Sequence, residues 1–341
     1  MKNFPESFSS QKELDEFINT PSSELVEYFR SLEGDVMVLG GSGKMGPAVS
    51  MMAKKAAELS GVDRNIYAVA RSAMPQLEAA GIKTFQCDLL DIEQLEKLPK
   101  AKNIIYLVGR KFGSTGNEGM TWAINTIVPS NVGRVFSGSN IVALSTGCVY
   151  PVADITSIGS SEMDAPAPVG EYATSCLGRE RVFDYYAAAN NFNIVHIRLN
   201  YSLDLRYGVL VDIARKVYEQ KSVDLTSGYF NGIWQGDACD QILRAISLAG
   251  RPGTALNITG PETLSVRQAA REFGQCFGKE PIFEGVENGK SYLSNASKAN
   301  GIFGNPRVPI SQVIKWTAQW VEQGGENWGK PTHFEVQDGK Y

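Results

Sequence analysis

Residues 35–48, DVMVLGGSGKMGPA, decide the fold of this 341-residue chain. The apolar run Val36-Met37-Val38-Leu39 predicts a strand, and a glycine-rich turn leads from it directly into a helical segment. Glycines allow backbone angles closed to other residues, close approach of the backbone to a pyrophosphate, and tight packing of the helix on the strand. The spacing fits both GxGxxG and GxxGxxG, which also occur in purely structural turns, but the strand before it and the helix after it favour dinucleotide binding. We expect the amides at the start of the helix to hold the phosphates.

Strands and helices keep alternating after this stretch. Further strand-like runs fall at residues 65–70, 83–87, 103–108, 140–145 and 193–199. The alternation predicts an α/β fold with a doubly wound parallel sheet, the Rossmann architecture. The runs lack apolar–polar alternation, as expected for strands that are covered on both faces.

The pattern divides the chain into three parts. Residues 1–34 contain two short amphipathic segments and predict an N-terminal helical extension. Residues 35–200 predict the dinucleotide-binding Rossmann domain. Residues 201–341 are expected to form mainly a smaller substrate-binding lobe, in which residues 236–260 return to the sheet.

Composition and charge argue against several partners. The net charge is −4 and basic clusters are missing, so we expect neither a nucleic acid nor a membrane surface as a partner. No apolar run approaches the roughly 20 residues that span a bilayer, and the first residues are too polar for a secretory signal, which predicts a cytoplasmic protein. The five scattered cysteines form no CxxC and the chain has only two histidines, so we expect no metal site.

Several motifs, in their order along the chain, resemble the extended short-chain dehydrogenase/reductase family, which includes sugar epimerases and dehydratases. Ser145-Thr146-Gly147-Cys148-Val149-Tyr150-Pro151 looks like its Ser-Ser/Thr-x-x-Val-Tyr-Gly segment, and Gly170-Glu171-Tyr172-Ala173-Thr174-Ser175 looks like the start of its Tyr-x-x-x-Lys helix. The resemblance runs from about residue 36 to residue 272. It also rests on the glycine turn, Cys87-Asp88-Leu89, Asn125 and Thr259-Gly260-Pro261-Glu262.

The resemblance implies an NAD(P)-dependent oxidoreductase or epimerase acting on a carbonyl or hydroxyl of a sugar, sugar acid or nucleotide sugar. Thr146 would hydrogen-bond the reacting oxygen and Tyr172 would move its proton. The expected cofactor contacts are Gly40, Gly43, Lys44, Met45, Gly46, Arg71, Asp88, Leu89, Val108, Gly109, Lys111, Asn125, Tyr172, Cys176 and Leu199. The expected substrate contacts are Thr146, Cys148, Asn200, Arg206 and Tyr207.

One departure from the family concerns the catalytic lysine. Four residues after Tyr172 the family has a lysine that lowers the pKa of the phenol, and this chain has Cys176. A tyrosine with a pKa of ~10 is only about 0.1% ionised at pH 7, so reduction, in which the phenol gives a proton, is easier to support than oxidation. Lys111, in a segment similar to the epimerases' Ala-Gly-x-Lys, is the expected catalytic replacement, and Arg179 is a second candidate. The alternative is a non-catalytic NADP(H)-binding redox sensor or structural protein that has lost the lysine.

The residues after the second strand favour NADP over NAD. NAD sites place an acid there for the ribose 2′-hydroxyl, whereas the strand here ends in Ala68-Val69-Ala70-Arg71-Ser72, and Arg71, with Lys44, suits a 2′-phosphate. Family members often pair through the helices after the fourth and fifth strands, here about residues 119–136 and 170–190. We therefore expect a homodimer. No function follows from the polar stretch at residues 329–335.

Overall fold

A seven-stranded parallel sheet forms the centre of the protein. The computed structural model describes residues 4–340. The strand order is β3-β2-β1-β4-β5-β7-β12. The strands are β1 (Val36–Leu39), β2 (Ile66–Ala70), β3 (Lys83–Gln86), β4 (Asn103–Tyr106), β5 (Asn140–Thr146), β7 (Asn193–Leu199) and β12 (Thr254–Ile258). The order reverses between β1 and β4, which opens a crevice at the carboxyl ends of these strands. The predicted doubly wound Rossmann fold is confirmed.

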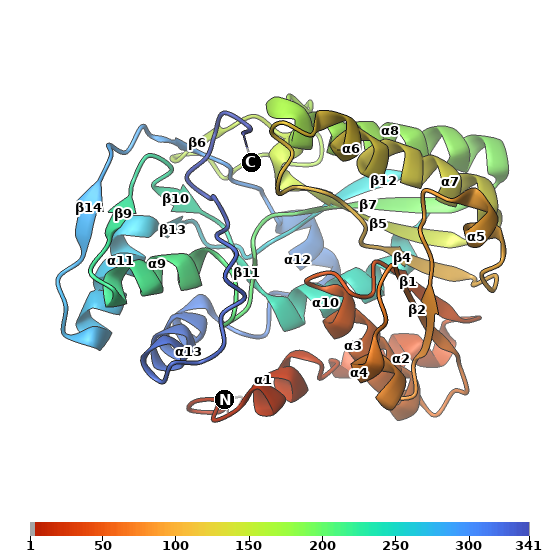
Figure 1. Cartoon of the computed structure of the whole chain (residues 1–341), viewed down its shortest axis with the longest axis horizontal. Helices are drawn as coiled ribbons and strands as arrows, with labels where there is room; N and C mark the ends of the chain where they lie inside the picture. Colours follow the sequence, from red (N-terminus) through yellow and green to blue (C-terminus); the bar gives the residue numbers. More distant parts are fainter. Residues whose placement is uncertain (1–3, 341) are drawn as a thin grey trace.

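Helices cover both faces of the sheet (Figure 1). Val36 and Val38 pack with one face's helices, and Met37 and Leu39 pack with those of the other face. One face carries α2 (Ser23–Ser31), α3 (Gly46–Ser60), α4 (Pro75–Ala79) and α10 (Gln235–Arg244). The other carries α5 (Ile92–Glu96), α6 (Glu118–Trp122), the π-turn η1 (Ala123–Ile127), α7 (Val128–Val135) and α8 (Gly170–Asn190). Since both faces are covered, β1 is apolar at every position.

A smaller lobe forms beside the carboxyl edge of the sheet. Its helices are α9 (Val209–Tyr218), α11 (Val266–Phe277), α12 (Ser297–Phe303) and α13 (Ile310–Glu322), and η3 (Ala245–Leu248) follows α10. Its short strands are β8 (Ser202–Leu203), β9 (Ser222–Asp224), β10 (Tyr229–Phe230), β11 (Ile233–Trp234), β13 (Leu264–Ser265) and β14 (Ile282–Glu284). Between residues 200 and 253 the chain leaves the sheet, and it returns as β12, which pairs with β7. The lobe and the sheet are therefore built from interleaved segments.

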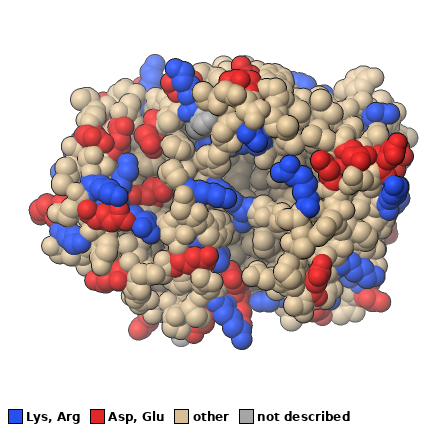
Figure 2. Space-filling view, in the orientation of Figure 1, with Lys and Arg blue, Asp and Glu red and all other residues tan. Residues whose placement is uncertain are grey.

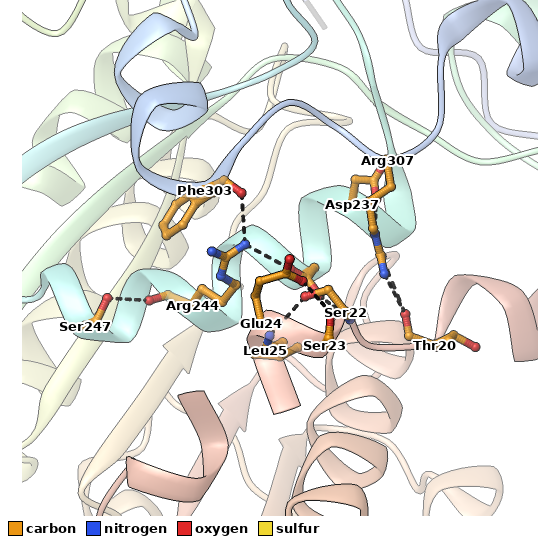
Figure 3. A network of polar contacts seen from close by, with 11 residues as sticks. Thr20, Ser22, Ser23, Glu24, Leu25, Asp237, Arg244, Ser247, Phe303 and Arg307 are labelled. Atoms are coloured by element: carbon orange, nitrogen blue, oxygen red, sulfur yellow. Dashed lines mark hydrogen bonds and ion pairs between the residues drawn. The ribbon is translucent and has the colours of Figure 1, made fainter. Parts of the chain in front are cut away.

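Buried acids of α10, together with Arg307, link the N-terminal extension to the sheet's helices and to the lobe. The extension's helices are α1 (Gln11–Ile18) and α2, and residues 1–3 lie outside the described part of the chain. The Ser22 amide donates to Asp240 Oδ1 at 2.8 Å. Arg307, in the loop before α13, donates to Asp237 Oδ1 at 2.7 Å and also reaches the Thr20 carbonyl (Figure 3). The extension thereby bridges the sheet and the lobe.

The last described residues cross the molecule as an extended segment, which we name the C-terminal strap (residues 326–340). In Figure 1 it is the dark blue chain that runs from α13 between the two halves. Phe334 anchors it in the main hydrophobic core, being only 2% exposed. Its far end packs on the first residue of α8, where a Cβ on Gly170 would lie 2.6 Å from the Gly339 carbonyl oxygen. The strap thus links the lobe to the start of the helix that carries Tyr172.

Two short pairings complete the described secondary structure. β6 (Ala153–Asp154), which follows the 3-10 turn η2 (Gly147–Val149), pairs with β15 (Lys290–Ser291). Within residues 4–340, no helix combines the length and the apolar character needed to cross a membrane.

Candidate active site

A cavity of about 640 Å³ lies at the carboxyl ends of the central strands. Its walls come from the glycine turn, the loop after β4, the end of β5, the first turn of α8, the loop after β7 and the strap. Figure 2 shows a central hollow with Lys and Arg side chains on its rim. The volume is in the range of sites that hold small molecules and cofactors.

The glycine turn has the geometry of a phosphate cradle. Gly40 has φ of 97°, and the Gly43 amide donates to the Gly40 carbonyl at 3.0 Å. A Cβ on Gly46 would lie 2.5 Å from the Gly41 carbonyl oxygen and closer still to that of Gly40. The 15-residue helix α3 begins there without a side-chain cap. The Gly46 amide donates to the Gly43 carbonyl at 3.2 Å and Pro47 has no amide hydrogen, so it is the close backbone approach allowed by the glycines of the turn that fits the pyrophosphate of a dinucleotide.

Thr146 and Tyr172 meet on the wall of this cavity. Thr146 ends β5, where its hydroxyl accepts a hydrogen bond from the Cys148 amide at 3.2 Å. Burial raises the pKa of Tyr172 well above its ordinary value, and a hydrogen bond between Tyr172 and Thr146 opposes that shift only in part. The phenol therefore stays protonated at neutral pH, the state in which it can give a proton.

Cys176 lies directly beside Tyr172. Its side chain is 1% exposed, and its thiol shares a hydrogen bond with the phenol. Burial raises the pKa of the thiol, although the nearby Arg179 opposes this. The group at the lysine position is therefore neutral and supplies no positive charge to the phenol.

Both suggested replacement cations line the cavity. Lys111 Nζ lies 5.8 Å from the centre of the Tyr172 ring and donates to the Thr332 carbonyl at 3.2 Å. Burial lowers the pKa of Lys111, which makes its ammonium readier to release a proton. Arg179 donates to the Leu144 carbonyl at 2.6 Å. Burial opposes the charge of Arg179, yet the buried thiol and phenol groups around it raise its pKa, so it stays cationic.

Lys44 points across the cavity toward the lobe. Its ammonium lies 3.2 Å from the centre of the Tyr207 ring and 4.4 Å from that of Phe112. Burial, followed by repulsion from Lys111 and Lys330, lowers the pKa of Lys44 to about 7. Lys44 and Arg71 were expected to bind the same 2′-phosphate, but only Lys44 lines the cavity. Arg71 is exposed at the end of β2 and does not line the cavity.

Two expected contacts prove to be structural. Asn125 is fully buried, and its amide bonds both the amide and the carbonyl of Arg110, as well as Arg179 and Ser175. Both the oxygen and the nitrogen of its side-chain amide are used in hydrogen bonds that fix the loop after β4 to α8. The expected cofactor contact of Asn125 is therefore corrected to a positioning role.

Arg206 requires the same correction. Its guanidinium forms a bidentate ion pair with Asp204, at 2.9 and 2.7 Å. It also donates to Asp15 at 2.8 Å and lies against the ring of Trp328. It binds the extension and the strap together instead of facing substrate. Arg198, near the end of β7, is likewise buried against Glu180 and Tyr150. Both arginines follow or end a strand, but the acids that pair with them decide where they point.

The remaining predicted residues fall into two groups. Those lining the cavity are Gly43, Met45, Gly46, Gly109, Cys148, Leu199, Asn200 and Tyr207. Those outside it are Gly40, which shapes the turn, Val108, which packs on Gly40, and Asp88 and Leu89 after β3. Asp88 and Leu89, with Arg71, follow β2 and β3 beside the turn and stay predictions for the adenosine half of a dinucleotide.

The strap contributes three cavity residues that the sequence did not indicate: Trp328, Lys330 and Thr332. They lie more than 90 residues after the other lining segments, in a stretch without helix or strand periodicity. The only signal was the unusual density of polar groups at residues 329–335.

The fold and the cavity define a class of protein, the Rossmann-type dinucleotide-binding enzymes. A family model described as "NAD dependent epimerase/dehydratase family" matches residues 36–225, more than half of the chain. The chain belongs to this family, which confirms the resemblance to the extended short-chain dehydrogenases/reductases. No curated protein matches it.

Solved structures confirm the fold. A dTDP-glucose 4,6-dehydratase from Bacillus anthracis in complex with NAD is 16% identical, with a TM-score of 0.72 over 85% of this chain and 97% of that one. An epimerase from Methanothermobacter thermautotrophicus is 18% identical, with a TM-score of 0.71 over 89% and 96%. A UDP-glucose 4-epimerase from Thermus thermophilus in complex with NAD is 18% identical, with a TM-score of 0.67 over 84% and 98%. At these identities the likeness concerns the fold alone.

Proposed function

We propose that this protein is an NAD(P)H-dependent oxidoreductase that reduces a carbonyl group of a sugar, sugar acid or nucleotide sugar. The observation that carries the proposal is the Tyr172 phenol, kept protonated by burial and hydrogen-bonded to Thr146 on the wall of the cavity beside the glycine turn. Two of the similar structures, a dTDP-glucose 4,6-dehydratase and a UDP-glucose 4-epimerase, are named for nucleotide-sugar substrates, which supports this substrate class.

Each residue of the site would have its own role in this reaction. The nicotinamide supplies a hydride when the cofactor is bound. Thr146 and Tyr172 would hold the carbonyl oxygen of the substrate, and Tyr172 would give its proton to that oxygen as negative charge develops there. Lys111, 5.8 Å from the ring centre of Tyr172, would stabilise the phenolate left behind. Cys176 takes no part in the proton transfer, because its pKa is raised by burial.

The non-catalytic redox sensor is the weaker alternative. Redox-sensing thiols have a low pKa and are accessible to oxidants. Cys176 is 1% exposed and its pKa is raised. These properties favour a packing role for this thiol.

We expect NADPH to bind more tightly than NADH, because Arg71 can pair with a 2′-phosphate. Replacing Arg71 with Ala should weaken NADPH binding about tenfold and leave NADH binding unchanged. Fluorescence titration of both dinucleotides measures this. Arg134→Ala, at an exposed arginine of α7, is the matched control. Equal affinities for the two dinucleotides in the wild type would contradict the preference.

We expect a homodimer through the outer faces of α6, η1, α7 and α8. Four large apolar side chains are exposed there: Met120 (42%), Trp122 (36%), Ile127 (52%) and Tyr185 (67%). Ile127→Glu should halve the mass measured by light scattering, because a charge would be buried at the contact. Val286→Glu, at an exposed position of the lobe, should leave it unchanged. A monomeric wild type would refute the dimer.

A further inference from the structure

The charged residues that line the cavity are all cations. They are Lys44, Lys111, Arg179 and Lys330, and the described lining residues include no Asp or Glu. This concentration of positive charge lies in a chain whose net charge is −4. Holding like charges close together costs free energy, which an anionic ligand recovers when it binds among them. The cavity is therefore built for an anion.

Lys330 is held in place by an anchor on each side. Two residues before it, the Trp328 amide donates to the Arg206 carbonyl at 3.1 Å, and the Trp328 ring stacks on Tyr207 with centres 6.1 Å apart. Two residues after it, the amide and hydroxyl of Thr332 donate to Asp212 Oδ2 at 2.8 and 2.6 Å. The backbone that carries Lys330 is thus fixed at the cavity edge before any ligand arrives.

Lys44 faces the strap from the glycine turn. The Lys44 ammonium lies 3.2 Å from the centre of the Tyr207 ring, and Trp328 of the strap stacks on the same ring. The glycine turn and the strap therefore both contact Tyr207. Lys330 is close enough to Lys44 to contribute to its lowered pKa. Neither lysine forms an ion pair within residues 4–340, although Asp212, which Thr332 engages, raises the pKa of Lys44. Neither side chain is therefore held by a carboxylate contact that a ligand would have to break.

We propose that Lys330 of the strap and Lys44 of the glycine turn form a clamp for the diphosphate group of a ligand. Two ammonium groups, one from the glycine turn and one from the strap, suit an extended group with two charged centres better than a single carboxylate. The diphosphate belongs either to the dinucleotide or to a nucleotide-sugar substrate. The inference rests on the proposed function, because it concerns the same cavity.

Calorimetric titration of the purified full-length chain tests the clamp. The probes are NADPH, NADH, UDP-glucose and inorganic pyrophosphate, with wild type, Lys330→Met and Lys44→Met. We expect each variant to weaken pyrophosphate and at least one nucleotide about tenfold or more. Lys340→Met is the matched control, because Lys340 is an exposed lysine of the same strap that pairs with Asp338 at 3.5 Å. The melting temperatures without ligand should match for Lys330→Met and wild type, since Lys330 is exposed.

The pattern of losses identifies the ligand. Equal weakening of NADPH and NADH assigns the clamp to the cofactor, and weakening of UDP-glucose alone assigns it to the substrate. If Lys330→Met binds every probe with wild-type affinity, the clamp is overturned, even if the dinucleotides bind well. A wild type that binds pyrophosphate through Lys330 but neither dinucleotide supports the clamp and refutes the proposed function, so the two failures are distinguishable.

Discussion

Replacing Tyr172 with Phe is expected to lower the turnover of a carbonyl substrate about 1,000-fold while NADPH binding changes by less than about twofold. The substitution removes one oxygen, the only group of Tyr172 that can give a proton. The ring stays, so the packing against Cys176 and the cavity wall is retained. The measurement is the NADPH-dependent absorbance change at saturating substrate, once a carbonyl compound with turnover has been found.

The pH profile separates a chemical role of Tyr172 from a structural one. In the wild type the protonated phenol is the active form, and burial raises its pKa. Turnover should therefore hold through neutral pH and fall only as the pH rises through that raised value. Thr146→Val is the companion variant, because it keeps the shape of the side chain and removes the hydrogen bond to the phenol. Turnover of Tyr172→Phe at the wild-type rate would remove this residue from the mechanism.

Replacing Gly46 with Ala is expected to weaken NADPH binding at least ~100-fold, equivalent to about 2.7 kcal/mol. The added Cβ would lie 2.5 Å from the Gly41 carbonyl oxygen and closer to that of Gly40, so the turn must move away from the start of α3. That movement separates the amides that should hold the pyrophosphate. The same crowding should lower the free energy of unfolding by about 1–3 kcal/mol. Titration and denaturant unfolding measure the two effects.

Gly301→Ala controls for the general effect of adding a methyl group to a helical glycine. Gly301 lies in α12, and a Cβ there meets no heavy atom within 4 Å. This variant should bind NADPH like wild type and unfold at the same or a higher denaturant concentration. Wild-type affinity in Gly46→Ala would show that the turn does not hold the cofactor.

The sequence predicted the fold because its signals are local. The strand, turn and helix at residues 35–48 are adjacent in the chain, and so is each later strand to its helix. The site depends on contacts between distant residues, and there prediction was incomplete. From the sequence, Arg206 was expected to bind substrate, but in the structure its guanidinium forms ion pairs with Asp204 and Asp15. Nothing in the sequence showed that residue 332 would bond to residues 111 and 212.

The replacement of the family lysine by Cys176 also shows which properties the sequence reveals and which depend on the folded structure. The substitution by Cys176 was visible in the sequence, but its effect depended on burial, which raises the pKa of the thiol and leaves the phenol without a cation at that position. The suggestion that Lys111 replaces the lysine came from a short motif. The structure adds its position against Tyr172 and the strap, which the motif did not contain.

The strap follows the segments that form the sheet and the lobe along the chain. The sheet is complete once residue 258 has been made, and the lobe's last helix ends at Glu322. Because proteins form from their N-terminal parts first during synthesis, Lys330 joins a cavity whose other walls already exist. The strap residues described here belong to no strand or helix, so an exposed residue among them such as Lys330 can change without disturbing the sheet. Ligand choice in this protein is therefore open to change over evolution through residues 326–340 while the Rossmann core stays the same.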